Sequence, residues 1–296
     1  MLIDRLIEKT NELDSPIIVG IDPVFEKLPV EMREMAISKY GETERSYANA
    51  VIEFGKAIID SVEGLSCIVK PQLAYFEVLG SAGLDAYAEV VRYARYRDFI
   101  VIADAKRGDI GSTSAAYAKA FLGKTGLEAD FITVNPYLGS DCLREFIKFV
   151  DDYDKGIFVL VKTSNPSSAE LQDLRTEDGR RIYEVMGAMT QQLSSERIGK
   201  YGYSNIGAVV GATHPSELKE LRRQMPSVPF LVPGYGAQGG TAQDVAGAFD
   251  AAGNGAYINS SRGIIYAKEE GVGFMKAMRN AAERMKQDFK SVRRSR

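Results

Sequence analysis

The sequence contains few of the residues from which metal centres and histidine-based catalytic sites are built. It has one histidine, His214, and two cysteines, Cys67 and Cys142, among 296 residues. The cysteines have no metal-binding spacing, and a single histidine argues against a histidine-based metal site. It also leaves only one candidate base for a Ser-His-Asp triad. We expect Cys67, inside a predicted strand, to be a small buried hydrophobic residue.

Long apolar runs and a strong net charge are also missing. No apolar run approaches the length that spans a membrane, and no signal peptide precedes the amphipathic start, so we expect a cytoplasmic protein. The formal net charge is −3, with 45% hydrophobic and 26% charged residues, which is typical of a soluble globular protein. This composition does not indicate a nucleic acid or a membrane as a partner.

The sequence does contain a regular alternation of short apolar runs and amphipathic segments. Runs of strand length lie at 16–22, 66–70, 99–106, 130–135, 156–162, 206–212, 228–232 and 255–260. Segments of helical periodicity lie at 2–13, 47–62, 84–95, 112–122, 142–150, 180–195, 216–224, 242–252 and 274–289. Near-continuous apolar strands that alternate with helices predict a parallel sheet covered by helices. Eight such units predict a (β/α)₈ barrel, with an open doubly wound sheet as the alternative.

Three segments are longer than a plain barrel requires: residues 196–205, which precede the sixth predicted strand, and two others. Residues 23–44 contain a short helix-like run, and residues 164–179 are rich in Ser, Asn, Pro, Asp and Gly. The second composition predicts a mobile loop. Because no linker divides the chain, we expect one barrel domain over residues 1–296, with an N-terminal helix and these two insertions.

Charged residues gather where the first three predicted strands end. Asp22 and Lys70 each precede a proline, which cannot donate to a strand ladder and therefore marks the end of a strand. The run 99–106 ends on Asp104 and Lys106, whose side chains would leave the same face of an extended strand. The carboxyl ends of all strands in a barrel face the same way. A surface salt bridge would explain one Asp-x-Lys pair, but alternating charges from three strands favour a functional site.

A glycine-rich segment follows the seventh predicted strand. Pro233-Gly-Tyr-Gly-Ala-Gln-Gly-Gly240 contains the Gly-x-Gly-x-x-Gly pattern of dinucleotide-binding folds. We discount that interpretation because only one strand follows, and Arg262 rather than an acidic residue comes after it. Backbone amides and an arginine after strands seven and eight predict a phosphate site instead. A flexible turn is the structural alternative.

The run Asp104-Ala-Lys106-Arg-Gly-Asp109-Ile-Gly-Ser-Thr113, together with Lys70, the 233–240 segment and Arg262, resembles the orotidine 5′-monophosphate decarboxylase family. The similarity is to the longer branch of that family and extends from Asp22 to Arg262. It implies a (β/α)₈ homodimer that uses no metal and no cofactor. Its reaction converts orotidine monophosphate to uridine monophosphate and carbon dioxide, the last step of de novo pyrimidine synthesis.

The resemblance also implies a role for individual residues. Lys70, Asp104 and Lys106 of one subunit would meet Asp109 of the other, and Lys106 would protonate the ring carbon that loses carbon dioxide. The implied ribose contacts are Asp22, Lys70 and the partner subunit's Thr113. Either Ser164 or Thr163 would contact the pyrimidine amide, and Gln238, Arg262 and the amides near Ser261 would bind the phosphate. Pro233 is a further implied substrate contact.

Elementary chemistry agrees with this assignment. Loss of carbon dioxide leaves a ring carbanion with no conjugated electron sink, and a fixed ammonium can both stabilise the charge and donate the proton. Flanking carboxylates would keep Lys106 in its cationic form. The sequence leaves open whether Asp104 also destabilises the substrate carboxylate.

Two other functions share some of these features. A sugar-phosphate decarboxylase or aldolase with the same Asp-x-Lys-x-x-Asp core would need a divalent metal, so sensitivity to chelators separates it from the first hypothesis. A nucleotide-binding regulator built on a barrel should lack the alternating charges at the rim.

Overall fold

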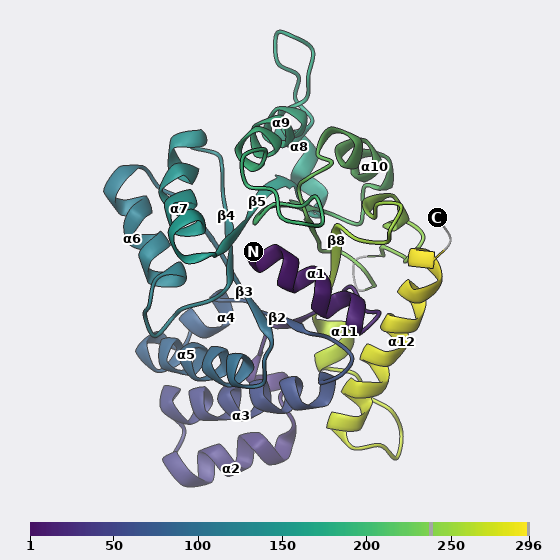
Figure 1. The fold of residues 1–296 in the computed structure, drawn as a ribbon. Coiled ribbons are helices and arrows are strands. Elements are labelled where there is room, and N and C mark those ends of the chain that lie inside the picture. Colours follow the sequence, from purple (N-terminus) through teal and green to yellow (C-terminus); the bar gives the residue numbers. More distant parts are fainter. Residues whose placement is uncertain (237–238, 295–296) are drawn as a thin grey trace.

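The strands of this chain close into a parallel barrel (Figure 1). The computed structural model describes residues 1–236 and 239–294. The strands are β1 (Ile17–Ile21), β2 (Ile68–Pro71), β3 (Ile100–Arg107), β4 (Phe131–Val134), β5 (Gly156–Lys162), β6 (Ile206–Val210), β7 (Phe230–Val232) and β8 (Ala256–Ser260). Each strand pairs with the next, and β8 pairs with β1. The predicted (β/α)₈ barrel is confirmed, and the open doubly wound sheet is excluded.

Helices surround the barrel and cover the outer face of its sheet (Figure 1). They are α1 (Leu2–Glu12), α2 (Val30–Tyr40), α3 (Glu44–Val62), α4 (Ala74–Glu77), α5 (Gly80–Tyr96), α6 (Gly111–Leu122), α7 (Ser140–Tyr153), α8 (Ala169–Gln172), α9 (Ile182–Ser194), α10 (Pro215–Gln224), α11 (Arg262–Ile265) and α12 (Phe274–Arg294). Short 3₁₀ turns lie at η1 (Phe25–Lys27), η2 (Pro166–Ser168) and η3 (Ala246–Ala248). Among the described residues, no helix combines the length and the apolar character needed to cross a membrane.

The strands are apolar almost throughout because both of their faces are buried. One hydrophobic cluster lies between the strands and the outer helices, and a second fills the inside of the barrel. The inner cluster includes Ile18, Ile100 and Phe158 from the strands and Leu6 from α1. Helix α1 therefore plugs the amino-terminal end of the barrel, where it crosses the centre of Figure 1. The carboxyl-terminal end remains available for a site.

One predicted helix is wrong. Residues 242–252 have helical periodicity, but only the short turn η3 forms there. Gly247 weakens a helix, and the side chain of Asp250 accepts hydrogen bonds from the amides of Ala252 and Asn254, which fold the chain into a turn. The guanidinium of the half-buried Arg222 also donates to the carbonyl of Ala248 at 2.8 Å. These contacts replace the hydrogen bonds that a continued helix would make.

The two insertions are more regular than the sequence suggested. Residues 23–44 contain η1 and the three-turn helix α2, and residues 164–179 contain η2 and α8 before a turn closed between Thr176 and Arg180. That turn projects beyond α8 and α9 at the top of Figure 1. The insertion is tied to the end of β5, because Lys162, which is fully buried, pairs with Asp173 at 2.6 Å.

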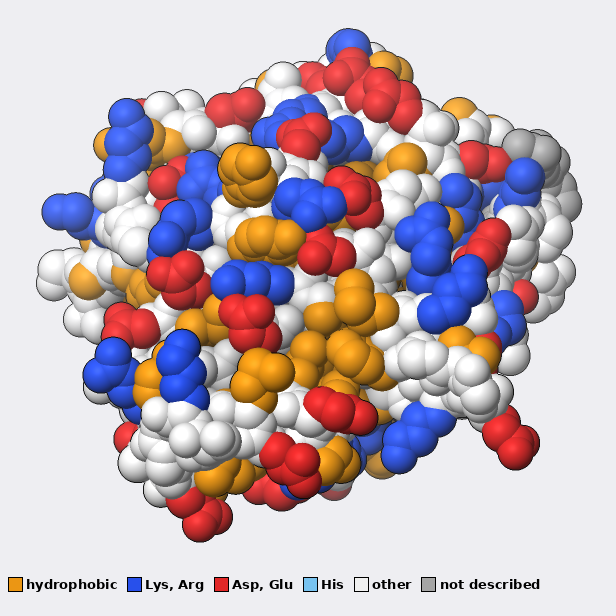
Figure 2. Space-filling model, turned by 90° about the horizontal axis from the view of Figure 1, so that it is seen from below, with side chains coloured by type: hydrophobic (Ala, Val, Ile, Leu, Met, Phe, Trp, Pro, Cys, Tyr) orange, Lys and Arg blue, Asp and Glu red, His pale blue; other side chains and the backbone are white. Residues whose placement is uncertain are grey.

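Figure 2 shows the molecule from below the view of Figure 1, on the side where α2 and α3 lie. Basic and acidic side chains alternate across it, and a group of hydrophobic side chains lies near its middle. Helix α2 exposes Val30 and Met35. Among the described residues, the basic side chains on this face are interrupted by acidic ones and form no continuous basic surface of the kind that binds nucleic acid.

Candidate active site

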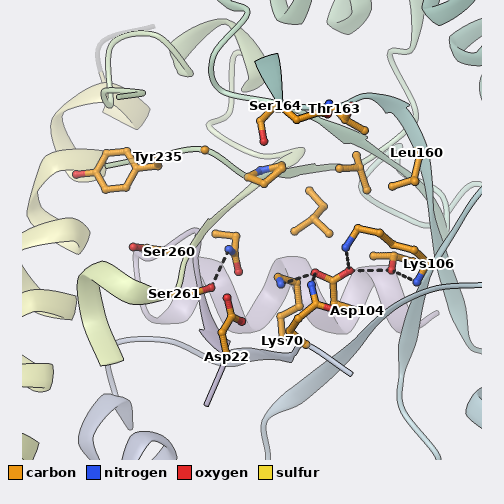
Figure 3. Close-up of a pocket in the computed structure, with 18 of the residues that line it drawn as sticks. Asp22, Lys70, Asp104, Lys106, Leu160, Thr163, Ser164, Tyr235, Ser260 and Ser261 are labelled. Carbon is orange, nitrogen blue, oxygen red and sulfur yellow. Dashed lines mark hydrogen bonds and ion pairs between the residues drawn. The ribbon is translucent and has the colours of Figure 1, made fainter. Parts of the chain in front are cut away.

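A cavity of about 420 Å³ opens at the carboxyl ends of the strands. The predicted site residues that line it are Asp22, Lys70, Asp104, Lys106, Ser164, Pro233, Ser261 and Arg262. They come from loops and strand ends spread over the barrel from β1 to β8. Figure 3 shows Lys70, Asp104 and Lys106 in a row on one side of the cavity, with Thr163 and Ser164 across from them.

The carboxylate of Asp104 lies at the centre of this row. Its Oδ2 accepts hydrogen bonds from Lys70 Nζ at 2.6 Å and from Gln72 Nε2 at 3.0 Å. Its Oδ1 accepts from Lys106 Nζ at 2.6 Å and from Thr133 Oγ1 at 3.0 Å. The predicted meeting of Lys70, Asp104 and Lys106 is thus present, but Gln72 and Thr133 were not predicted.

Burial and charge act against each other in this row. Burial would raise the pKa of Asp104, but the attraction of Lys70 and Lys106 and their hydrogen bonds outweigh it and hold that pKa well below its usual range. Burial would likewise lower the pKa of Lys70, but the negative charges of Asp104 and Asp22 raise it above its ordinary value. Asp104 is therefore an anion and Lys70 a cation at neutral pH, although the side chain of Lys70 is only 5% exposed.

The backbone at Lys106 is not the extended strand that the sequence predicts. Its φ is +46°, in the left-handed region that costs a residue with a side chain roughly 1–3 kcal/mol. The pairing of β3 with β4 shifts here: β3 advances from Ala103 to Arg107 while β4 advances only from Ile132 to Val134. The two charged side chains therefore meet through a bulge and not through simple alternation.

A second group of residues surrounds the end of the cavity near β1 and β8. Asp22 Oδ1 and Asn259 Oδ1 are buried and have no hydrogen-bond partner among the described residues, although both residues line the cavity. Buried oxygen atoms of this kind are normally satisfied, and a ligand that brings hydroxyl donors would satisfy these two. A Cβ at Gly20 would lie 1.8 Å from Ser261 Oγ, so only glycine there lets Ser261 reach its position.

The loops after β7 and β8 line the cavity next to Asp22 and Asn259. Pro233, Tyr235, Ser261 and Arg262 line the cavity, and Arg262 is exposed at the start of α11. Gly234 has φ +100°, a conformation that favours glycine and turns the chain sharply after the strand. The predicted phosphate contact Gln238 lies outside the described residues.

Thr163 and Ser164 follow β5 and lie across the cavity from the charged row (Figure 3). The amide of Thr163 donates to Gln172 Oε1 at 2.9 Å, and Gln172 Nε2 donates to Thr163 Oγ1 at 2.7 Å. That hydroxyl in turn donates to Asn165 Oδ1 at 2.7 Å. The Thr163 hydroxyl is therefore already engaged as both donor and acceptor, which favours Ser164 for contact with a ligand.

Asp109 and Thr113 lie away from the cavity within the part of the chain that the structure describes. Asp109 follows β3 in a loop, and its Oδ1 accepts from the amide of Ile110 at 2.7 Å. Thr113 is exposed in the first turn of α6. The loops after β2, β3 and β4 also expose large hydrophobic residues, namely Val78, Ile110, Tyr137 and Leu138. These residues follow three neighbouring strands at the carboxyl-terminal end of the barrel.

Comparison with known proteins gives a consistent result. The model of the "Orotidine 5'-phosphate decarboxylase / HUMPS family" matches residues 17–274. The orotidine 5′-phosphate decarboxylase of Clostridium perfringens (strain SM101 / Type A) is 40% identical over 295 residues, which cover 100% of this chain and 98% of that protein. The protein of the same name from Rhodopirellula baltica is 48% identical over 254 residues, covering 84% of this chain and 83% of its own.

Solved structures show the same likeness. The structure of a putative orotidine-monophosphate-decarboxylase from Toxoplasma gondii superposes with a TM-score of 0.83 at 32% identity, and the match covers 98% of this chain and 96% of that one. The structure of Leishmania donovani OMP decarboxylase gives a TM-score of 0.77 at 33% identity, covering 98% of each chain.

Proposed function

This chain belongs to the orotidine 5′-phosphate decarboxylase family, and we propose that it converts orotidine 5′-monophosphate to uridine 5′-monophosphate and carbon dioxide with the rim residues described above. The reaction is the last step of pyrimidine (UMP) synthesis. The observation that carries the proposal is the row of a buried cation, an anion and a second cation in the cavity, with both ammonium groups 2.6 Å from the carboxylate.

Lys106 is the proton donor in this proposal. The bond between the ring carbon and its carboxylate breaks, carbon dioxide leaves, and the electron pair remains on the ring carbon. The Lys106 ammonium stabilises that pair and then transfers a proton to it, and water returns a proton to the amine. The side chain of Lys106 is 48% exposed, so it faces the open cavity, whereas the more deeply buried Lys70 holds Asp104 in place.

We propose that neither a metal ion nor a cofactor takes part. The carboxylate of Asp104 is already bound to two ammonium groups, and these positive charges disfavour a metal cation at the same oxygen atoms. Lys106 also supplies both the charge and the proton that the reaction needs. Activity that survives dialysis against a chelator would support this, and activity restored by magnesium would favour a metal-dependent sugar-phosphate enzyme.

The substrate would bind along the cavity between β5 and β1. Asp22 and Asn259, whose oxygen atoms lack partners among the described residues, would accept from the ribose hydroxyls. Ser164 would contact the pyrimidine amide, since the Thr163 hydroxyl is engaged. The phosphate would be bound by Arg262, Gln238 and the amides near Ser261, and Pro233 would contact the substrate as part of the cavity lining.

We further propose a cytoplasmic homodimer with shared sites. Asp109 and Thr113 would reach the cavity of the partner subunit, because they lie outside the cavity of their own chain as described. The exposed Ile110 beside them would be buried at the interface. A two-fold dimer would then contain two identical shared sites. Cys67 and Cys142 are free thiols, as is usual in the cytoplasm.

Turnover of the nucleotide is the direct test. Adding the purified protein to orotidine monophosphate should remove the ultraviolet absorption band of the orotate ring. Lys106→Ala should abolish turnover while binding of a substrate analogue persists, because Lys106 acts mainly on the transition state. A Lys106→Ala variant that keeps more than about a tenth of the wild-type kcat would exclude Lys106 as the proton donor.

A mixing experiment tests the shared site. Lys106→Ala and Asp109→Ala homodimers should each be nearly inactive, because each lacks one member of both sites. Unfolding and refolding them together should give hybrids with one intact site and recover up to roughly a quarter of wild-type activity after random pairing. If a mass tag confirms hybrids and no activity returns, Asp109 belongs to the site of its own subunit.

A further inference from the structure

Thr133, in β4, connects the backbone of Lys106 to the carboxylate that binds its side chain. The Lys106 amide donates to Thr133 Oγ1 at 2.9 Å, and Thr133 Oγ1 donates to Asp104 Oδ1 at 3.0 Å. That same Oδ1 accepts from Lys106 Nζ at 2.6 Å. The contacts form a closed ring that begins and ends on Lys106. Thr133 is almost fully buried, with 1% of its surface exposed.

The directions of these hydrogen bonds follow from the chemistry of the groups. A backbone amide can only donate, and an ionised carboxylate can only accept. The hydroxyl of Thr133 therefore uses a lone pair for Lys106 and its one proton for Asp104. Valine has the same shape as threonine but can do neither, whereas serine can do both.

The bulge in β3 explains why a side chain is needed at this place. Between Ala103 and Arg107 the strand is not in register with β4, so the Lys106 amide is outside the regular ladder. Its backbone also lies in the left-handed region, at φ +46°. A partly buried amide without an acceptor would destabilise this conformation, and the hydroxyl of the buried Thr133 provides the acceptor.

We propose that Thr133 is a positioning residue for the decarboxylation: it fixes the base of the Lys106 side chain and orients Asp104, so that the ammonium group is aimed at the reacting carbon. This inference rests on the proposed function. Lysine has a long flexible chain and Lys106 is half exposed, so its ammonium group is directed only if both the backbone and Asp104 are fixed. When the ammonium group leaves Oδ1 to deliver its proton, Thr133 still donates to that oxygen.

The test compares Thr133→Val and Thr133→Ser with the wild type. We measure kcat and KM for orotidine monophosphate, equilibrium binding of uridine monophosphate, and the thermal unfolding midpoint. Thr133→Val should lower kcat by about 10- to 100-fold, the effect expected for one hydrogen bond to a charged group, with KM and product binding nearly unchanged. Thr133→Ser should keep most of the activity. Thr190→Val is the matched control, because Thr190 is fully buried in α9 and donates only to Met186 O, at 2.8 Å.

Three outcomes would overturn the inference. They are a Thr133→Val variant with kcat within about twofold of wild type, equal losses in the valine and serine variants, and a loss in product binding as large as the loss in kcat. If Thr133→Val does not fold, Thr133→Ala against Thr133→Ser makes the same comparison, since they differ only in the hydroxyl. A wild-type protein that does not consume the nucleotide would instead refute the proposed function.

Discussion

Replacing Asp104 by asparagine would remove the counter-charge that is hydrogen-bonded to the buried ammonium of Lys70 and leave Asp22 as the other negative charge acting on it. In the structure the Asp104 carboxylate lies 2.6 Å from Lys70 Nζ and 2.6 Å from Lys106 Nζ. The side chains of Lys70 and Asp104 are only 5% and 9% exposed, so water in the cavity can compensate only in part for the missing charge. Lys106, with 48% of its side chain exposed, can turn toward solvent and should contribute little to the loss of stability.

The expected magnitude follows from the cost of a buried unpaired charge. Removing one partner of a buried ion pair typically costs about 3–5 kcal/mol, so Asp104→Asn should lower the free energy of unfolding by that amount. Adding Lys70→Met to the Asp104→Asn variant removes the buried cation that has lost its hydrogen-bonded carboxylate, and it keeps a side chain of similar length. The double variant should therefore recover most of the loss and lie within about 2 kcal/mol of wild type, a strongly non-additive result.

Urea unfolding followed by circular dichroism at pH 7 measures these differences, since the chain has no tryptophan to report by fluorescence. Glu145→Gln is the control, because it breaks the surface pair with Lys148 and should change stability by less than about 1 kcal/mol. The pKa of Asp104 is lower in the folded than in the unfolded chain. Its contribution is therefore present above about pH 4 and declines as the pH falls below that value. The reasoning is refuted if Asp104→Asn costs less than about 1 kcal/mol, or if the double variant is less stable than the single one.

Three further predictions concern other parts of the molecule. Arg262→Ala should weaken turnover of the nucleotide but scarcely change the slow reaction of the phosphate-free nucleoside; equal losses in steady-state assays would make Arg262 structural. Arg222 is half-buried, lies over the ring of Phe230 and donates to four backbone carbonyls, so Arg222→Met should lower the free energy of unfolding by at least about 3 kcal/mol, and a neutral result would contradict this. Burial raises the pKa of Cys67 to about 12, so iodoacetamide at pH 8 should label it only after unfolding. Because an unfolded thiol ionises near pH 8.5, this group should also reduce stability progressively as the pH rises from about 8.5 toward 12, which thermal midpoints measured with Cys67→Ala would reveal.

Much of the fold could be predicted because its signals are local and repeated. The strands of a barrel are buried on both faces, so each appears as a short run of apolar residues, and residues 17–21 or 156–162 illustrate this. Prolines after Asp22 and Lys70 marked strand ends, and parallel strands bring such ends together. The helix predicted at 242–252 was wrong because Arg222, distant in the sequence, binds a carbonyl within it.

The charged part of the site was also predictable, since a cation and an anion at the end of an apolar strand are conspicuous. The neutral part was not. Gln72 and Thr133 are ordinary residues in their own segments, and no spacing relates them to Asp104. Gln72 donates to the carboxylate across neighbouring strands. Thr133 lies beside Asp104 because Ala103 of β3 pairs with Ile132 of β4, a register that the sequence does not display.

The position of Lys106 shows why the two parts differ. Two-residue alternation predicted that Lys106 and Asp104 would share a face, and their side chains do meet at 2.6 Å. They meet, however, through a left-handed residue in a bulge, whose amide is bound by the Thr133 hydroxyl and not by the strand ladder. Opposite charges determine that Asp104 interacts with Lys106, and charged residues can be identified from the sequence alone. The direction in which an ammonium group points is set by neutral donors and acceptors that become recognisable only when the register of the neighbouring strand is known.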